Sequence, residues 1–377
     1  MKKLGYLVAL YPIGFIDSVI ALRISLLLLL FSVVINRRLS LVDWLLLGLL
    51  GITAYSWLTV GGYERSFIAP QISSYYVFLF SLRFFYVSRD DLLNFITNLP
   101  LFHYLLLCVV YLVVQVKVGY TYEVGVLEAF MLIRLALQER QRGLMLAMLL
   151  AYLVLMFLIS TRTTPLGIAL LVAGCCLLKP PKPVLKAVVM GVILLTPVAG
   201  FFLMGLDLSS SMADVDDNAE IRLEMLKGAS SMIGISEFLH GVGFGGPYRD
   251  VSFKYAFWHP LLDTRFLAHQ VSNHNSLFDV FFRFGIFVYA LFAVVFLRVI
   301  WLDKTTNHYV YALLFVTLFS LSVNAYLDST RLSHAFAAFI IGLMLLIPRR
   351  TLRHQRAPNA AVVRAGSRAA DVAKSPG

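Results

Sequence analysis

The sequence predicts an all-α fold, a transmembrane bundle of about 12 helices. Hydrophobic residues make up 59% of the 377-residue chain and charged residues only 14%, whereas a soluble domain is about a quarter charged. Apolar runs of 15 to 25 residues recur along most of the chain, with short polar turns between them. In lipid only helices and closed barrels satisfy their backbone groups. Because these runs are too long and too evenly apolar for barrel strands, they predict membrane-spanning helices.

The first apolar segment permits two interpretations. Residues 4–36 are apolar, but Pro12, Asp17 and Arg23 interrupt them, and Arg37-Arg38 follow. A tight pair of short helices would bring both ends to the same side of the membrane, and a single long helix is the alternative. The other predicted helices cover residues 42–60, 67–87, 93–115, 123–137, 144–160, 165–179, 185–205, 275–300, 308–326 and 333–348.

A long polar segment divides the chain. Residues 1–205 are predicted to hold helices one to nine, and residues 274–350 to hold helices ten to twelve. Between them, residues 206–273 form a loop of a length that is uncommon unless the loop has a function. Residues 351–377 lack apolar periodicity and are expected to form a disordered tail.

The distribution of basic residues predicts the orientation of the bundle. Short loops on the cytoplasmic side of membrane proteins carry an excess of Lys and Arg. One set of turns holds most of them, namely Arg37, Arg38, Arg89, Arg140, Arg142, Lys179, Lys182, Lys304, Arg349, Arg350 and Arg353. The opposite short turns hold Arg65, Lys117, Arg162 and Arg331. Both termini are therefore expected in the cytoplasm and the long loop outside it, which in a bacterium is the periplasmic face of the inner membrane.

Composition argues against several other classes of protein. The formal net charge is +11, but membrane topology explains the basic residues and no nucleic-acid-binding module is visible, so no nucleic-acid partner is expected. The three cysteines, Cys108, Cys175 and Cys176, lie in apolar runs without metal-ligand spacing. They are interpreted as packing residues, and neither a metal nor a cofactor is expected.

The long loop shows internal order. Apolar residues at helical spacing predict an amphipathic helix over residues 218–239, which a glycine-rich turn at 241–246 ends. Aromatic residues follow, among them Trp258. They suit the membrane interface or, in the less common case, the apolar faces of sugar rings.

Polar residues continue where the loop re-enters the membrane. Asn275, Asp279 and Arg283 are four residues apart and share one stripe of a helix. Charges at that depth are costly and are candidates for function, although a structural Asp279–Arg283 ion pair is the simpler alternative.

Three further residues on the same predicted side could carry chemistry. Arg162 ends a predicted helix, Arg222 opens the loop helix, and His274 precedes Asn275. Two arginines would suit a diphosphate leaving group through charge-assisted hydrogen bonds, and a histidine could take the proton of an attacking hydroxyl. Taken singly, the arginines are typical of interfacial anchors and the histidine of a loop cap.

The ordered set of motifs resembles the O-antigen polymerase and ligase superfamily of bacterial membrane glycosyltransferases. Ser160-Thr161-Arg162-Thr163 looks like the family's Ser-Arg motif, and Arg222 to Gly243 resembles its loop arginine, amphipathic helix and Gly-x-Gly turn. His274-Asn275-Ser276-Leu277, followed by Gly285, resembles its His-Asn motif. The resemblance covers residues from about 140 to 290. Val288 and Ile159 depart from the pattern at positions of packing rather than charge.

The resemblance implies an inverting, metal-independent glycosyltransferase that uses a glycan on undecaprenyl diphosphate as donor. By position, Arg162 and Arg222 would hold the diphosphate and His274 would activate the acceptor hydroxyl. Asn275, Trp258 and Arg331 are the candidate substrate-binding residues. A repeat-unit polymerase, with a flippase and a chain-length regulator as partners, is the first expectation, and a ligase that acts on lipid A-core is the second. A transporter of the lipid-linked sugar is a more distant alternative, since no internal repeat is visible.

Overall fold

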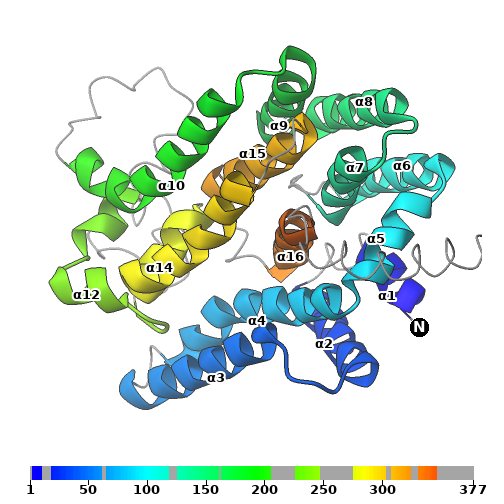
Figure 1. Cartoon of the computed structure of the whole chain (residues 1–377). Helices are drawn as coiled ribbons and strands as arrows, with labels where there is room; N and C mark the ends of the chain where they lie inside the picture. The colour runs from blue at the N-terminus through cyan, green and yellow to red at the C-terminus, as the bar shows by residue number, and fades with distance from the viewer. Residues whose placement is uncertain are drawn as a thin grey trace, which may run out of the picture.

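The computed structural model describes residues 2–10, 18–61, 65–118, 125–160, 163–204, 226–246, 275–302, 307–323 and 330–345. The regular elements in these ranges are helices, and no strand occurs among them (Figure 1). The predicted all-α class is therefore confirmed for the part of the chain that the structure describes.

Within the described ranges, four helices are long and apolar enough to cross a membrane. These are α3 (Leu41–Thr59), α8 (Arg142–Ser160), α10 (Lys182–Met204) and α14 (Ser276–Leu302). The bent pair of α5 (Arg89–Asn98) and α6 (Leu101–Val118) would make a fifth span if the two helices cross together. Several apolar helices could thus span a membrane, whereas the full set of about 12 predicted helices stays a prediction.

The N-terminal segment forms two helices, α1 (Lys2–Leu10) and α2 (Ser18–Ile35). This agrees with the predicted pair rather than with one long helix, and the residues between them lie outside the described residues. The Tyr6 hydroxyl donates to the Ser88 carbonyl oxygen at 2.9 Å. Lys2 Nζ lies 2.5 Å from an Asp91 carboxylate oxygen. Both contacts fix α1 to the junction at which α5 begins.

The single helix predicted over residues 93–115 is wrong. The structure has α5 and α6 instead, and their axes differ by 93°. Leu99 between them is extended, with φ −64° and ψ 122°. Pro100 explains the break, because proline disfavours helical geometry in the residue before it and has no N–H to donate.

Helix α4 (Arg65–Val87) occupies the middle of the N-terminal half, packed against α2, α3 and α16 (Thr330–Leu345) (Figure 1). It buries polar side chains as well as apolar ones, namely Gln71, Ser74, Ser81 and Arg83. Polar groups on a helix among apolar neighbours are expected to face protein rather than lipid. The position of α4 between other helices meets that expectation.

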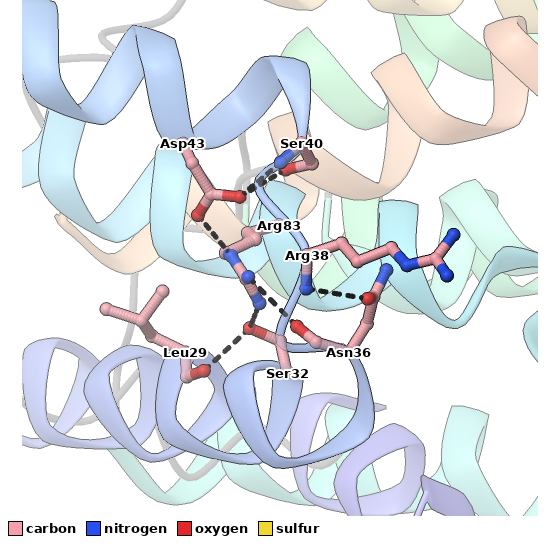
Figure 2. A network of polar contacts seen from close by, with 7 residues as sticks. All are labelled: Leu29, Ser32, Asn36, Arg38, Ser40, Asp43 and Arg83. Atoms are coloured by element: carbon pink, nitrogen blue, oxygen red, sulfur yellow. Dashed lines mark hydrogen bonds and ion pairs between the residues drawn. The ribbon is translucent and has the colours of Figure 1, made fainter.

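Arg83, near the end of α4, holds the turn between α2 and α3 (Figure 2). Its guanidinium donates to an Asp43 carboxylate oxygen, to the Ser32 hydroxyl oxygen and to the Asn36 carbonyl oxygen. The other Asp43 oxygen accepts from the Ser40 backbone N–H at 2.6 Å and from its hydroxyl at 2.7 Å. The basic turn at Arg37-Arg38 is thereby anchored to this end of α4.

Helix α7 (Val126–Leu137) is surrounded by other helices, and its residues from Val126 to Ala136 are buried. Its two charged residues, Glu128 and Arg134, are buried as well, and charges in an apolar bundle are expected to face protein rather than lipid. Its C-terminal carbonyls find partners on two neighbouring elements. Asn307 Nδ2, just before α15 (His308–Val323), donates to Ala136 O at 2.7 Å, and Arg142 Nε of α8 donates to Leu135 O at 3.0 Å.

The helix predicted to start at Pro165 begins slightly earlier. It consists of α9 (Thr163–Ala173), with Pro165 in its first turn, and of a π-helical turn η2 (Gly174–Leu178). Lys179, with φ 49°, ends it. Cys175 and Cys176 lie buried in this turn, which agrees with their interpretation as packing residues.

The amphipathic helix predicted over residues 218–239 is not continuous. Residues 205–225 lie outside the described residues, residues 226–231 are helical, and a separate helix α12 (Ile235–His240) follows. Gly234 between them is extended and acts as the N-cap of α12, with its N–H donating to Glu237 Oε2 at 3.1 Å. Glycine is a poor interior helix residue, which explains the break in an otherwise helical pattern.

Candidate functional site

The structure describes two of the six sequence-predicted site residues in part. Asn275 directly precedes α14, and Arg331 lies in the first turn of α16. Arg162, Arg222, Trp258 and His274 lie outside the described residues. Their predicted convergence therefore stays a prediction, and the geometry below concerns the glycine-rich turn and the start of α14.

The glycine-rich turn is built from residues in the left-handed region. Gly241, Gly243 and Gly245 have φ values of 80°, 76° and 86°. Residues other than glycine rarely adopt such φ values. The turn begins as α12 ends, where the Gly241 N–H donates to Glu237 O at 2.7 Å. The sequence-predicted turn at 241–246 is thus present, and its conformation explains its glycines.

This turn docks on a break in α14. Gly285 interrupts the helix with φ 75° and ψ −179°, which leaves carbonyl groups of the preceding turn for partners outside the helix. Val242 N–H donates to Phe282 O at 2.8 Å, and Gly243 N–H donates to Arg283 O at 3.1 Å. Two backbone hydrogen bonds therefore join the turn to the first half of α14.

Both sides of this contact require glycine for space as well as for conformation. A Cβ atom on Gly241 would lie 2.2 Å from Arg283 O, and a Cβ atom on Gly285 would lie 2.2 Å from Leu239 O. Neither neighbour is the movable end of a side chain, because both are backbone. The close approach of the two backbones is therefore possible only with glycine at these two positions.

The Arg283 side chain lies beneath the turn and is fully buried. Its Nη1 donates to Gly243 O at 2.6 Å, and its Nε lies 4.0 Å from Asp279 Oδ1. The guanidinium carbon stands 5.8 Å from the Phe244 ring centroid and 5.4 Å from that of Phe282. These contacts give Arg283 a structural role in holding the turn, which the sequence did not predict. The Asp279–Arg283 pair that the simpler alternative expected is present only at 4.0 Å.

Asp279 connects α14 to α4. It is 1% exposed, and its Oδ2 accepts from the Tyr75 hydroxyl at 2.7 Å. The Tyr75 ring also packs edge-on against Phe244, with the ring centroids 5.5 Å apart, and against Phe284, with the centroids 5.3 Å apart. A buried carboxylate needs such partners, because an unpaired charge is costly to bury.

Gln71 of α4 pairs with the backbone of the turn. Its Oε1 accepts from Gly245 N–H at 2.7 Å, and its Nε2 donates to Gly246 O at 3.3 Å. A Cβ atom on Gly245 would lie 2.9 Å from Val60 Cγ1 and 3.0 Å from Ile68 Cγ1. The turn therefore sits at the end of the molecule where α3 ends and α4 begins (Figure 1).

Asn275 caps the start of α14. Its side-chain Oδ1 accepts from Phe278 N–H at 2.9 Å, which satisfies one of the free donors of the first turn. The Asn275 side-chain amide NH₂ could still contact a substrate, so its predicted binding role stays a prediction.

The sequence indicated the turn and α14 but not the contribution of α4. Gln71 and Tyr75 are four residues apart and therefore share one face of that helix. Polar residues at this spacing in an apolar context were the available signal. Nothing in the sequence showed that their partners lie in the distant glycine-rich turn and in α14.

Comparisons with protein-family models, with curated proteins and with solved structures find no match to this chain.

Proposed function

We propose that this protein is a membrane glycosyltransferase that polymerises oligosaccharide repeat units carried on polyprenyl diphosphate. The product would be a surface polysaccharide, an O-antigen or an exopolysaccharide, made on the periplasmic face of a bacterial inner membrane. Several apolar helices that could span a membrane are consistent with a lipid-linked substrate.

One structural observation supports this proposal most. The glycine-rich turn and the start of α14 are two of the segments on which the family resemblance rests, and they lie against each other through the Val242–Phe282 and Gly243–Arg283 hydrogen bonds. Arg283 follows Asn275, the residue before α14, by eight positions, which corresponds to about 12 Å along a helix. The described chain at the start of α14 therefore lies about 12 Å along the helix from the docked turn, and His274 itself lies outside the described residues.

In the proposed reaction, an acceptor sugar hydroxyl attacks the anomeric carbon of the donor glycan. The new glycosidic bond forms as the bond to the diphosphate breaks, and polyprenyl diphosphate leaves with the electron pair. His274 would take the hydroxyl proton. Arg162 and Arg222 would stabilise the negative charge that develops on the leaving group, which is worth most where water is excluded.

Trp258, Asn275 and Arg331 would bind the substrate sugars. Trp258 would stack on a sugar ring, while the Asn275 amide and the Arg331 guanidinium would hydrogen-bond to hydroxyl or phosphate oxygens. The polyprenyl chain would lie against the lipid-facing helices. No metal and no organic cofactor takes part in this proposal.

An O-antigen ligase is the second candidate, because transfer to lipid A-core uses the same donor site and the same leaving group. Mass analysis of lipid-linked glycans in a strain that lacks the gene separates the two. Single repeat units attached to lipid A-core would support the polymerase, whereas full-length chains left on the lipid carrier would support the ligase. Unaltered glycans would count against both and favour another function, such as transport of the lipid-linked sugar.

A further inference from the structure

The glycine-rich turn and α14 both depend on contacts from α4, a helix outside the segment that resembles the transferase family. Gln71 and Tyr75 lie one helical turn apart on the same face of α4. Gln71 reaches the turn, and Tyr75 reaches α14. One face of α4 therefore contacts both partners of the docking at the Gly285 break.

The Gln71 carboxamide behaves like a peptide group added to the turn. It accepts from Gly245 N–H and donates to Gly246 O, at 2.7 and 3.3 Å. Gln71 is 5% exposed, so these hydrogen bonds offset the cost of burying the carboxamide. These hydrogen bonds form only when the turn packs against α4. The Gln71 amide therefore stabilises the docked position of the turn over undocked positions.

The Tyr75 hydroxyl contacts α14, on which the turn docks. It donates to Asp279, which lies one helical turn after the Asn275 cap and one turn before Arg283. Arg283 in turn donates to the carbonyl oxygen of Gly243. The contacts therefore run from Tyr75 through Asp279 and Arg283 back to the same turn that Gln71 holds.

We propose that Gln71 and Tyr75 are positioning residues, which set the glycine-rich turn and the start of α14 in the arrangement that transfer requires. Neither is assigned a contact with substrate. The proposal rests on the proposed function for its catalytic consequence, but the docking itself can be measured without any assay of transfer.

The experiment uses the full-length protein in lipid nanodiscs and compares Gln71→Met and Tyr75→Phe with the unaltered chain. Hydrogen exchange is followed at the backbone amides of Val242, Gly243 and Gly245, whose hydrogen bonds report the docked turn. We expect each substitution to speed exchange there by about tenfold or more, while exchange in α8 stays unchanged. Tyr76→Phe is the matched control, because the neighbouring Tyr76 hydroxyl contacts the Thr53 hydroxyl of α3 at 2.9 Å instead.

Turnover per folded molecule is measured on the same samples with a lipid-linked oligosaccharide. We expect both variants to lower kcat by about tenfold with a smaller effect on the KM of the donor, and Tyr76→Phe to leave both constants unchanged. Unchanged exchange in both variants would overturn the positioning role, whatever the activity. Faster exchange with normal turnover would overturn its link to transfer. If the unaltered protein shows no transfer while exchange responds as expected, the proposed function fails and the docking role stands.

Discussion

Gly241 and Gly285 face each other across the contact between the loop and α14, and each lies against the backbone of the other's segment. A Cβ atom at Gly241 would meet Arg283 O at 2.2 Å, and one at Gly285 would meet Leu239 O at 2.2 Å. Both residues also have positive φ. The break in α14 therefore forms the surface on which the glycine-rich turn docks.

Gly285→Ala should destabilise the protein and release the turn. The backbone conformation of Gly285, with φ 75° and ψ −179°, costs on the order of 1–3 kcal/mol for a residue other than glycine. The overlap with Leu239 O cannot be relieved by a side-chain rotation. Thermal unfolding in detergent should show a clear loss of stability. Gly51→Ala in α3 is the control, because nothing lies within 4 Å of its Cβ position. Equal unfolding temperatures for the two variants would contradict the packing described for Gly285.

This contact also shows what the sequence could and could not predict. The apolar runs predicted most helices to within a few residues, because a membrane helix is recorded in composition alone. Pro100 divided a predicted helix, and Gly234 divided another. Both breakers are visible in the sequence, yet their effect depends on whether packing overrides local preference. The pairing of Gln71 with Gly245 joins residues far apart in the chain, which no local pattern encodes.

The sequence predicted the candidate site less completely than it predicted the helices. Asp279 and Arg283 were recognised from their spacing, but only the structure shows Tyr75 and Gly243 as their partners. The roles of Arg162, Arg222 and His274 rest on residue chemistry and on the family resemblance. They lie outside the described residues, so their placement is a matter for experiment.

The Arg83–Asp43 pair should contribute to stability mainly through the cost of breaking it. Both side chains are largely buried, so Arg83→Met alone should destabilise the protein by about 3–5 kcal/mol, because it leaves the Asp43 charge uncompensated. The double variant Arg83→Met with Asp43→Asn should lose less than the sum of the two single variants. A double-mutant cycle on the free energy of unfolding measures this. Strict additivity would contradict a direct interaction between the two groups.

Cysteine labelling tests the predicted orientation. Ser236 in α12 is exposed beside the glycine-rich turn, and Leu39 is 69% exposed in the basic turn between α2 and α3. These positions lie near opposite ends of α4. In spheroplasts, a membrane-impermeant maleimide should label Ser236→Cys and should label Leu39→Cys only after lysis. The reverse pattern would invert the predicted topology and place the loop in the cytoplasm.

Transfer by the purified protein should survive a chelator. In the proposed reaction Arg162 and Arg222 supply the positive charge that a divalent cation supplies in other transferases. Turnover should therefore be the same in EDTA as in added magnesium. Activity that disappears in EDTA and returns with magnesium or manganese would contradict the proposal and direct attention to Asp214, Asp216 and Asp217 as ligands.

The most direct test of the proposed function is turnover per folded molecule for Arg162→Lys, Arg222→Ala and His274→Ala in nanodiscs supplied with a lipid-linked repeat unit. Removal of a general base should lower turnover by about 100-fold or more with less effect on donor binding. Arg162→Lys keeps the charge but loses the planar guanidinium, so it should also be impaired. These losses should appear at normal abundance of folded protein. Near-normal polymer formation by normally expressed Arg222→Ala and His274→Ala proteins would contradict it.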